Sequence, residues 1–418
     1  MQVCIFEDHH FRTFLPLVYF RPVYELRCGA LSLRQKIEAC FTRPEVTLHL
    51  RGDLAQCYRD ESPGVAVNTM PNGDTWFING RLVADGALAR LVRRKRPEEC
   101  VYAADGEVAA AYVRAKNVPS VVRSWGEPIT PQNFQAIHSE PFEGTLARYP
   151  WDLVSRSADE IAIDFRRRPK KAPRGRRPKI YRGAELLNRK NIVLGGGSVV
   201  KPGAVLDAEK GPIILGPNVT IMPNAVIEGP VFIGEHSIIK AGAKIYHGTS
   251  VGARCKVGGE VEASVIQSHS NKQHDGFLGH SYLGSWVNIG ADTNTSDLKN
   301  TYGNVRVRLA DEEIDTGLQF VGLTLGDHSK TGINMMFDTG TVAGISCNLY
   351  GAGLPPKFVP SFSWGEKGAL TVYDLDKSVE TARRVMARRD VKMSEAYERL
   401  FRTVFLLTDP DRRKSGIA

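Results

Sequence analysis

The chain has 418 residues, a length that favours two or more domains over a single compact core. Its hydrophobic content of 42% and charged content of 24% are ordinary for a globular protein, and no apolar stretch approaches the roughly 18 residues of a membrane span. The seven cysteines show no CxxC pair, and the N-terminus has no basic start followed by an apolar run, so we expect free thiols and a cytoplasmic protein.

The first predicted unit, residues 1–165, alternates short apolar runs with helical patterns. We expect helices over Leu31–Phe41 and Ala87–Arg96, where apolar residues recur at helical spacing. Strands are expected at Val3–Phe6, Val46–Leu50, Val65–Val67, Thr75–Ile78 and Val101–Ala103. Such alternation predicts an α/β layer with a largely parallel sheet.

A strongly basic segment, residues 166–179, follows and reads RRRPKKAPRGRRPK. It holds nine basic residues, three prolines and no acidic residue, and it accounts for the formal charge of +9. Like charges repel and proline prevents regular pairing, so we expect a solvated linker. A sharper alternative is an arm that binds RNA, membrane or nucleotide phosphates, although no aromatic residues interleave the charges.

Residues 180–370 carry a repeat of six. Eight aliphatic residues recur at this step: Leu215, Ile221, Ile227, Ile233, Ile239, Ile245, Val251 and Val257. Small or β-branched residues lie four positions after the first seven: Val219, Ala225, Val231, Ser237, Ala243, Thr249 and Cys255. Three six-residue units close one triangular coil, and stacked coils bury a column that one coil cannot bury alone. The pattern predicts a parallel β-helix that begins with Leu194, Val200 and Leu206, with a three-residue loop before Leu215.

The period of six is broken twice, and loops that break a β-helix commonly carry chemistry. We predict one break from Ser264 to Leu283 and a polar excursion from Thr293 to Asp315. Beyond the repeats, residues 371–418 form a tail in which Asp376–Leu407 has apolar residues at helical spacing. We expect an amphipathic helical tail that serves packing or assembly.

The first break contains HDGFLGHSYLGSWVNIGA, from His274 to Ala291. This block resembles, in register and without gaps, the acetyltransferase domain of the bifunctional GlmU-type enzymes that make UDP-N-acetylglucosamine. The resemblance implies a left-handed β-helix, assembly as a homotrimer with the site between neighbouring β-helices, and acyl-CoA as co-substrate. It places His274 as the general base, Asn288 as a sugar contact and Ala291 with its backbone near the thioester. Phe277 stands where the family has tyrosine.

The residues agree with this chemistry independently. Acyl transfer to an amine needs a base of near-neutral pKa, and histidine suits this task. His280 is the second candidate base, and the structural alternative for His274 is a corner histidine bonded to the backbone. Lys244 is a candidate phosphate contact, and Asp297 replaces an asparagine of the family, so another amino sugar phosphate or a nucleotide sugar could be the acceptor. A polar lining could hold the sugar phosphate: Asn271, Lys272, Asn288, Asp292 and Asn294.

Zinc-dependent γ-type carbonic anhydrases are another class of hexapeptide β-helix, with three histidine ligands across a subunit interface. His269 and His274 are five residues apart, which suits that pattern, and His247 could be the third ligand. The separation of His247 from His269 is not a whole number of coils, so the stacking that would bring them together is missing.

The N-terminal unit resembles a divergent branch of sugar-phosphate nucleotidylyltransferases, which implies a Rossmann-like domain. The family's G-x-G-T-R phosphate loop is missing. Arg21, Arg27 and Lys36 could bind phosphates instead, or form surface and interdomain ion pairs, and Asp105 is a candidate Mg²⁺ ligand. The matching pieces are LPL at 15–17, Arg21-Pro22, Glu25-Leu26-Arg27, Gly29, Asn79-Gly80-Arg81 and Pro150-Trp151-Asp152-Leu153.

Together these features predict a bifunctional transferase of sugar-nucleotide synthesis. The β-helix would acylate an amino sugar phosphate from acetyl-CoA or another acyl-CoA. The α/β domain would join a sugar 1-phosphate to a nucleoside triphosphate, UTP by the resemblance, with Mg²⁺. The product would be of the UDP-N-acetylglucosamine type, for cell-envelope precursors, and we expect no nucleic-acid or membrane partner. Two alternatives stay open: one active domain with the other only binding or regulating, and a non-enzymatic assembly scaffold that binds nucleotide sugars.

Overall fold

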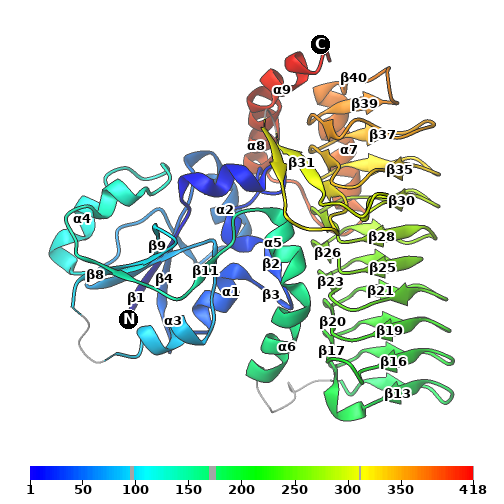
Figure 1. Ribbon diagram of the computed structural model, residues 1–418, viewed down its shortest axis with the longest axis horizontal. Helices are drawn as coiled ribbons and strands as arrows, with labels where there is room; N and C mark the ends of the chain where they lie inside the picture. Colours follow the sequence, from blue (N-terminus) through cyan, green and yellow to red (C-terminus); the bar gives the residue numbers. More distant parts are fainter. Residues whose placement is uncertain (95–97, 169–175, 310–311, 418) are drawn as a thin grey trace.

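The computed structural model describes residues 1–94, 98–168, 176–309 and 312–417. Figure 1 shows an N-terminal α/β domain beside a tall column of stacked strands, with C-terminal helices next to the upper part of the column. No helix within these ranges is long and apolar enough to cross a membrane.

The N-terminal domain is built on a seven-stranded sheet in the order β10-β8-β9-β6-β1-β4-β5. β1 (Gln2–Phe6) pairs in parallel with β4 (Glu45–His49) and β6 (Thr75–Asn79). The remaining strands are β5 (Ala66–Val67), β8 (Cys100–Ala104), β9 (Glu107–Val113) and β10 (Ser139–Pro141). Only β9 runs against both of its neighbours, so the predicted largely parallel sheet is confirmed.

Helices cover both faces of this sheet. Alternate residues of a strand point to opposite faces, so Val3 and Ile5 of β1 join one apolar cluster and Cys4 and Phe6 join another. The helices are α1 (Leu33–Glu38), α2 (Gly52–Glu61), α3 (Gly86–Leu91), α4 (Val118–Val121), α5 (Pro150–Ser155) and α6 (Ser157–Arg167). Two small ribbons pair β2 (Arg27–Cys28) with β3 (Leu31–Ser32) and β7 (Leu82–Val83) with β11 (Thr145–Leu146).

The predicted helices and linker differ from the structure at their ends. α1 begins only after Ser32, whose hydroxyl accepts from the Gln35 amide while the Gln35 side chain accepts from the Ser32 amide. The predicted linker, residues 166–179, begins inside α6, which continues to Arg167, and ends where β12 begins at Lys179. Residues 169–175 of that linker, and residues 95–96 of the second predicted helix, lie outside the described ranges.

The C-terminal half is a left-handed parallel β-helix with three faces. The first face holds β12 (Lys179–Ile180), β15 (Val199–Val200), β18 (Thr220–Ile221), β21 (Ile238–Ile239), β24 (Lys256–Val257), β27 (Asn271–Lys272), β34 (Lys330–Thr331), β37 (Asn348–Leu349), β39 (Ser363–Gly365) and β40 (Thr371–Val372). The second holds β13 (Glu185–Leu187), β16 (Val205–Asp207), β19 (Val226–Glu228), β22 (Lys244–Ile245), β25 (Glu260–Glu262), β28 (Phe277–Gly279), β30 (Asn294–Thr295) and β35 (Met336–Phe337). The third holds β14 (Ile192–Leu194), β17 (Ile213–Leu215), β20 (Val231–Ile233), β23 (Ser250–Val251), β26 (Val265–Ile266), β29 (Tyr282–Leu283), β33 (Thr324–Leu325), β36 (Val342–Ala343) and β38 (Phe358–Val359).

The interior of the β-helix follows the repeat of six. All eight repeating aliphatic residues, and the small residues four positions after them, are at most 1% exposed. Phe232 pairs with Ser250 on the next coil, which is the ordinary advance of three six-residue units. Ile192 pairs with Ile213, which is a longer advance than that ordinary coil, so the predicted three-residue loop before Leu215 is confirmed.

The predicted break from Ser264 to Leu283 is wrong. The β-helix is continuous there, because β26, β27, β28 and β29 each pair with the coil before them. Ser250 pairs with Val265, which is a shorter advance than the ordinary coil, so this coil is shortened rather than interrupted. The period fails in sequence because Lys272, not an aliphatic residue, takes the inward position of β27 and is 1% exposed.

The polar excursion is confirmed as an insertion. Tyr282 pairs with Thr324, far beyond the ordinary advance of one coil, and most of the extra chain leaves the column. Its hairpin pairs β31 (Arg306–Leu309) with β32 (Glu312–Asp315), and Figure 1 shows it between the β-helix and the N-terminal domain. The start of the predicted excursion stays in the column, where Asn294 and Thr295 form β30 and pair with β35.

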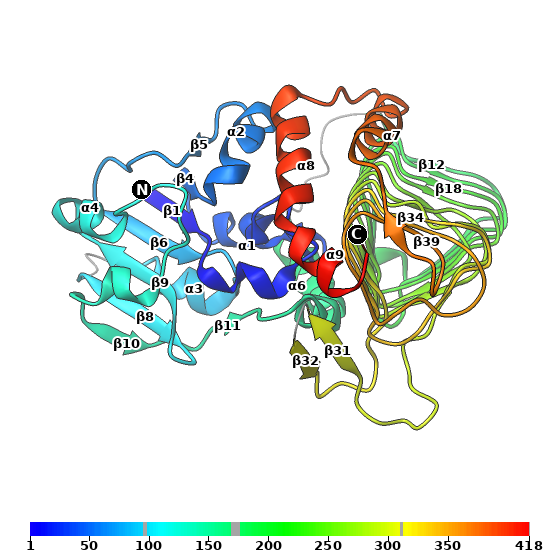
Figure 2. The same cartoon turned by 90° about the horizontal axis from the view of Figure 1, so that it is seen from above.

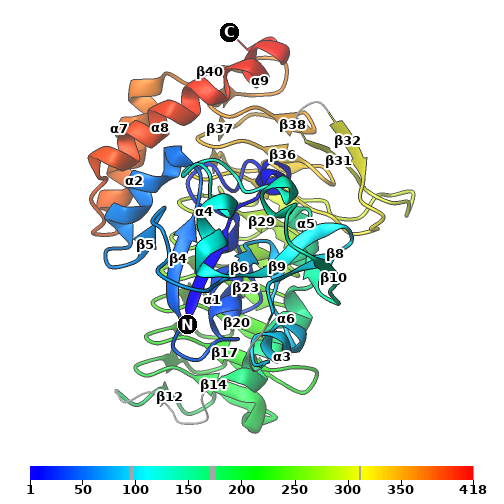
Figure 3. The same ribbon diagram turned by 90° about the vertical axis from the view of Figure 1, so that its left-hand side faces the viewer.

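The tail forms three helices, α7 (Leu375–Ala387), α8 (Glu395–Leu407) and α9 (Asp409–Lys414). The predicted helical segment is divided after Ala387, and Asp390 in the connection adopts a positive φ of 58°. Figures 2 and 3 show α8 beside α2 and α7 against the β-helix. The Tyr397 ring stacks on Phe20 at 5.0 Å, which ties α8 to the N-terminal domain.

Candidate functional site

The corner after β27 carries His274 on the surface. Its side chain is exposed, and among the described residues none forms a hydrogen bond with its imidazole in the structure. Beneath it, the Lys272 Nζ donates to the carbonyl oxygens of His274 (2.6 Å) and Asp275 (3.0 Å). Burial lowers the pKa of Lys272 to about 8, against the opposing charges of Asp275 and Asp292. Lys272 therefore holds the corner from inside the coil instead of facing a ligand.

Other predicted residues stack on the next coil at the same corner. The Asp292 amide donates to the Asp275 carbonyl oxygen (3.1 Å), and the Phe277 amide donates to Asn294 Oδ1 (2.8 Å). Asp292 and Asn294 are exposed, whereas Ala291 and Phe277 are half-buried. The same corner thus carries an exposed imidazole and, on the next coil, exposed carboxylate and amide side chains.

Asn271 and Asn288 lie on the first face, just before this corner. They are paired in register on adjacent coils, and the Asn271 Oδ1 accepts from Arg389 Nη2 at the end of α7 (2.7 Å). Both asparagines line a cavity of about 340 Å³ between this face and α7. Gln273, the neighbour of His274 in sequence, lines the same cavity.

His280, the second candidate base, is held by a carboxylate. Its Nδ1 lies 2.8 Å from Asp297 Oδ2, and its ring stacks on Phe320 at 5.0 Å. The side chain is 23% exposed, at the corner between β28 and β29. A carboxylate on Nδ1 favours the tautomer whose Nε2 can accept a proton. Asp297, which replaces a family asparagine, therefore orients a different histidine from the predicted base.

The three histidines of the zinc alternative do not converge. His247 Nδ1 lies 3.7 Å from Glu262 Oε1, whereas His269 stacks on Trp286 at 4.1 Å. Burial lowers the pKa of His269 to about 4. Within the described ranges, no three His, Cys, Asp or Glu side chains are grouped closely enough to hold a metal ion.

Two of the three cations predicted to bind nucleotide phosphates have carboxylate partners within the protein. Arg21 forms a bidentate ion pair with Asp327 of the β-helix, with Nη1 to Oδ1 at 2.9 Å and Nη2 to Oδ2 at 2.5 Å. Lys36 is fully buried, and its Nζ lies 2.7 Å from Glu160 and from Asp164 of α6. The Arg21 pair is the interdomain ion pair that the sequence left open as an alternative, whereas the Lys36 pairs are buried within the N-terminal domain.

Arg27, the third cation, pairs with no carboxylate in the described part of the chain. Its guanidinium donates to the Ala30 carbonyl oxygen (2.5 Å) and lies 5.0 Å from the ring of Phe232 on the β-helix. Burial lowers its pKa. Arg27 lines two cavities between the domains, of about 630 and 540 Å³.

Asp105 lies in the turn between β8 and β9. Its φ is +50°, its side chain is 83% exposed, and its recorded partner is Arg148 at 3.5 Å. A Mg²⁺ ion needs several oxygen ligands, of which protein carboxylates commonly supply one or two. Within the described ranges, Asp105 belongs to no group of three or more His, Cys, Asp or Glu side chains that could hold a metal ion.

The sequence analysis missed a buried ionic cluster at the carboxyl edge of the sheet, where open α/β sheets commonly bind ligands. Glu7 follows β1 and pairs with Arg51 after β4, with Nε to Oε2 at 3.1 Å. Asp8 pairs with Arg81 after β6, with Nη2 to Oδ2 at 2.6 Å. These pairs fill the edge, and the cavity beside them holds only about 20 Å³. Charged residues directly after three parallel strands were the signal that could have identified the cluster.

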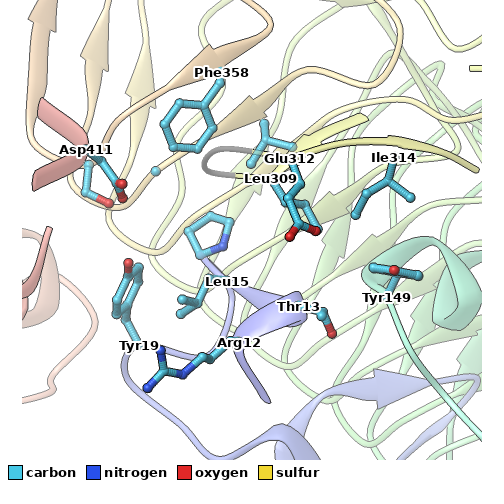
Figure 4. Close-up of a pocket in the computed structure, with 14 residues that line it drawn as sticks. Arg12, Thr13, Leu15, Tyr19, Tyr149, Leu309, Glu312, Ile314, Phe358 and Asp411 are labelled. Carbon is cyan, nitrogen blue, oxygen red and sulfur yellow. The ribbon is translucent and has the colours of Figure 1, made fainter. Parts of the chain in front are cut away.

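A mainly apolar cavity of about 350 Å³ lies where the three parts of the chain meet. Figure 4 shows Leu15 and Tyr19 of the N-terminal domain facing Phe358 of the β-helix, with Ile314 of the hairpin nearby. Asp411 of α9 closes one side. None of the predicted site residues lines this cavity.

Comparisons with known proteins agree with the two halves of the fold. Residues 3–172 match the family model described as sugar nucleotidyl transferase, and residues 212–245 match the bacterial transferase hexapeptide model. The chain therefore carries transferase-family domains in both halves.

Curated relatives are proteins named bifunctional GlmU. The protein from Synechococcus sp. (strain CC9311) is 28% identical over 193 residues, which is 45% of this chain and 37% of that protein. The protein from Methanocaldococcus jannaschii is 30% identical over 207 residues, which is 47% of this chain and 41% of that protein. The chain thus spans less than half the length of these relatives.

One solved structure, a UDP-N-acetylglucosamine acyltransferase, matches with 13% identity and a TM-score of 0.34, over 53% of this chain and 78% of that one.

Proposed function

We propose that this chain, a sugar nucleotidyl transferase domain joined to a hexapeptide-repeat β-helix, transfers an acyl group from acyl-CoA to the amine of an amino sugar phosphate. The observation that carries the proposal is the corner after β27. There His274 is exposed, fixed from below by Lys272, and accompanied by exposed Asp292 and Asn294 on the next coil. The block His274–Ala291 also resembles the GlmU-type acetyltransferase domain, which supports this assignment.

In the proposed reaction, the amine nitrogen of the acceptor attacks the thioester carbonyl carbon. A C–N bond forms, the C–S bond breaks, and CoA leaves as a thiolate that takes up a proton. His274 accepts the proton that the amine loses, which is the step a near-neutral base assists. Asp292 and Asn294 would hold sugar hydroxyls, because both are exposed on the coil that follows this corner.

The proposal includes a homotrimer. His274 lies on an open surface of the single chain, and a neighbouring β-helix would turn this surface into a cleft that excludes water. Sedimentation equilibrium of the full chain tests this directly. A mass of three chains supports the cleft, and a monomer at micromolar concentration contradicts it.

A second activity, nucleotidyl transfer by the N-terminal domain, is favoured by the family match of residues 3–172. A sugar 1-phosphate oxygen would attack the α-phosphorus of UTP, forming one P–O bond and releasing pyrophosphate. Arg27, which has no carboxylate partner in the described part of the chain, is the proposed phosphate contact. Mg²⁺ would balance the triphosphate charge.

Two assays test the two activities separately. Thiol release from acetyl-CoA is measured with glucosamine 1-phosphate, glucosamine 6-phosphate and other amino sugar phosphates. Pyrophosphate exchange is measured with UTP, Mg²⁺ and N-acetylglucosamine 1-phosphate. Thiol release with an amino sugar phosphate supports the leading proposal, and its absence with every acceptor contradicts it. Exchange without thiol release would leave the N-terminal domain as the single active part, and nucleotide-sugar binding without either turnover would indicate a scaffold.

A further inference from the structure

The cavity between the first face of the β-helix and α7 is lined by positively charged side chains. Lys256 and Lys330 line it from the β-helix, and Arg388 and Arg389 line it from the end of α7. No Asp or Glu is among its lining residues. Figure 2 shows α7 lying against the β-helix, so one wall is the column of strands and the other is this helix.

Successive coils place donor side chains in one row. Lys256 pairs in register with Asn271, Asn271 with Asn288, and Asn288 with Lys330. Each lies beside an inward-facing residue, such as Val257 at 0% exposure, so the row itself faces outward toward α7. Rungs of a sheet are about 4.8 Å apart, so several of these donors can reach the oxygen atoms of one phosphate or diphosphate group.

The positive charges of this cavity have no negative partner within the described part of the chain. Lys330 Nζ donates to the His328 carbonyl oxygen (2.7 Å) and Arg389 donates to the Asn271 amide, but no ion pair is formed by either. Burial lowers the pKa of Lys330 to about 8, and burial together with Arg389 lowers that of Lys256. By contrast, Lys36, which is fully buried, has two carboxylates beside it.

Arrangements of this kind are costly unless an anion binds. Four cations that repel one another, three of them partly removed from water, destabilise the empty cavity, whereas charge-assisted bonds to phosphate oxygens reverse that effect. The arginine guanidinium and the asparagine amide also offer the directed N–H groups that a phosphate accepts.

We propose that this cavity is an anion site that binds the phosphate or diphosphate group of a phosphorylated ligand. Gln273 lines the cavity and directly precedes His274, so a ligand anchored here by its phosphate lies next to the proposed acyl-transfer corner. The inference deepens the proposed function and rests on it only for the identity of the ligand, which is an amino sugar phosphate, a nucleotide or CoA. The cationic residues come from α7 and the first face, and the sequence analysis assigned none of them.

Titration calorimetry of the full chain at pH 7 and low salt tests the site without turnover. The probes are inorganic pyrophosphate, glucosamine 1-phosphate, UDP and CoA, and the ligand that binds most tightly identifies the source of the phosphate. Lys256→Gln with Arg388→Gln removes two charges from the cavity. The matched control, Arg384→Gln with Arg413→Gln, removes two charges from side chains that are each 75% exposed and paired with Glu380 and Asp409.

We expect the cavity variant to bind pyrophosphate about tenfold or more weakly, because it has lost two charge-assisted hydrogen bonds to the anion. The control should bind within about twofold of the unmodified chain, since exposed ion pairs contribute little. Thermal melting verifies that both variants fold, and a cavity variant that does not fold is replaced by Arg388→Gln alone. Equal binding by the cavity variant, or no binding of any probe by the unmodified chain, overturns the inference. Either result is independent of thiol release, so it can be told apart from failure of the acyl-transfer proposal.

Discussion

Two histidines on neighbouring corners of the β-helix are held in different ways. His274 is positioned through its backbone, whose carbonyl oxygen accepts from Lys272, and its imidazole is exposed. His280 is positioned through its side chain, by Asp297 at 2.8 Å. The family resemblance assigns the base to the first, and the local geometry equips the second for the same role.

Asp297→Asn separates these two assignments. Asparagine keeps the shape and one hydrogen bond to His280 but removes the carboxylate that fixes its tautomer. If His274 is the base, we expect kcat/KM for thiol release to stay within about threefold, because general-base losses are on the order of a hundredfold or more. A loss of that larger size in Asp297→Asn would assign the base to His280 instead.

The buried ammonium of Lys272 gives a prediction for stability against pH. Its pKa in the folded chain is about 8, below the roughly 10.4 of an unfolded lysine, so between these values the unfolded state binds more protons. Stability rises with pH wherever the unfolded state binds more protons, and the slope reaches about 1.4 kcal/mol per pH unit for one group. We therefore expect the unfolding free energy of the unmodified chain to rise relative to that of Lys272→Met as the pH increases from 8 to 10. Urea melts at several pH values measure it, and a constant difference would show that Lys272 titrates normally.

At the scale of elements, the repeat of six predicted the β-helix because every coil buries the same inward position. The prediction failed between Ser264 and Leu283 for two local reasons. Lys272 replaces an aliphatic residue at an inward position, and the coil from Ser250 to Val265 is closed by a shorter corner at Gly258 and Gly259. A periodicity count registers both features only as a loss of period, because it does not distinguish a buried lysine from an exposed one or a shortened coil from a loop.

The short corner at Gly259 can be tested with a matched glycine. Gly259 has a φ of +69°, and a Cβ there would lie 2.7 Å from the His274 carbonyl oxygen and 2.8 Å from Lys272 Nζ. Gly242 has a φ of +70°, but a Cβ there meets nothing within 4 Å. Both alanine variants lose about 1–2 kcal/mol because L-residues disfavour positive φ. We expect Gly259→Ala to lose at least about 1–3 kcal/mol more from overpacking, as seen in chemical denaturation, and to weaken thiol release. Equal losses in the two variants would contradict the tight corner.

The C-terminal tail shows that sequence periodicity predicts a helix but not the surface on which it packs. Apolar spacing predicted helical structure from Asp376 to Leu407, and α7 and α8 confirm it. The cationic cavity depends on where α7 ends, because Arg388 and Arg389 follow its last turn and face the β-helix. Which face a helix packs on is decided by tertiary contacts, so these two arginines could not be assigned from their positions in sequence.

At the scale of the whole molecule, the two domains are joined by buried polar contacts between residues far apart in sequence. Arg21 pairs with Asp327, and the Tyr282 hydroxyl accepts from the Arg27 amide at 2.8 Å. Asp327 is 1% exposed and also accepts from the Ser285 amide. The sequence identified both arginines as functional candidates, but their partners lie in the distant β-helix and no local pattern links them.

Breaking the Arg21 pair should loosen the junction. Arg21→Met leaves a buried Asp327 carboxylate without its partner, which typically costs about 3–5 kcal/mol. We expect the midpoint of thermal unfolding to fall by several degrees, up to about ten degrees. Replacing both residues, as Arg21→Met with Asp327→Leu, should recover much of the loss, because no uncompensated charge remains. An unchanged midpoint in the single variant would show that the pair contributes nothing to the junction.

The central claim is that the corner after β27 performs acyl transfer with His274 as base. The most direct test is kcat/KM for thiol release in His274→Asn beside His236→Asn, which changes another exposed corner histidine on an earlier coil. We expect kcat/KM to fall by about a hundredfold or more in His274→Asn, because that is the usual contribution of a general base. In His236→Asn we expect it to fall by less than about twofold. Retention of activity within a few-fold in His274→Asn, in a chain that releases thiol, would contradict the central claim.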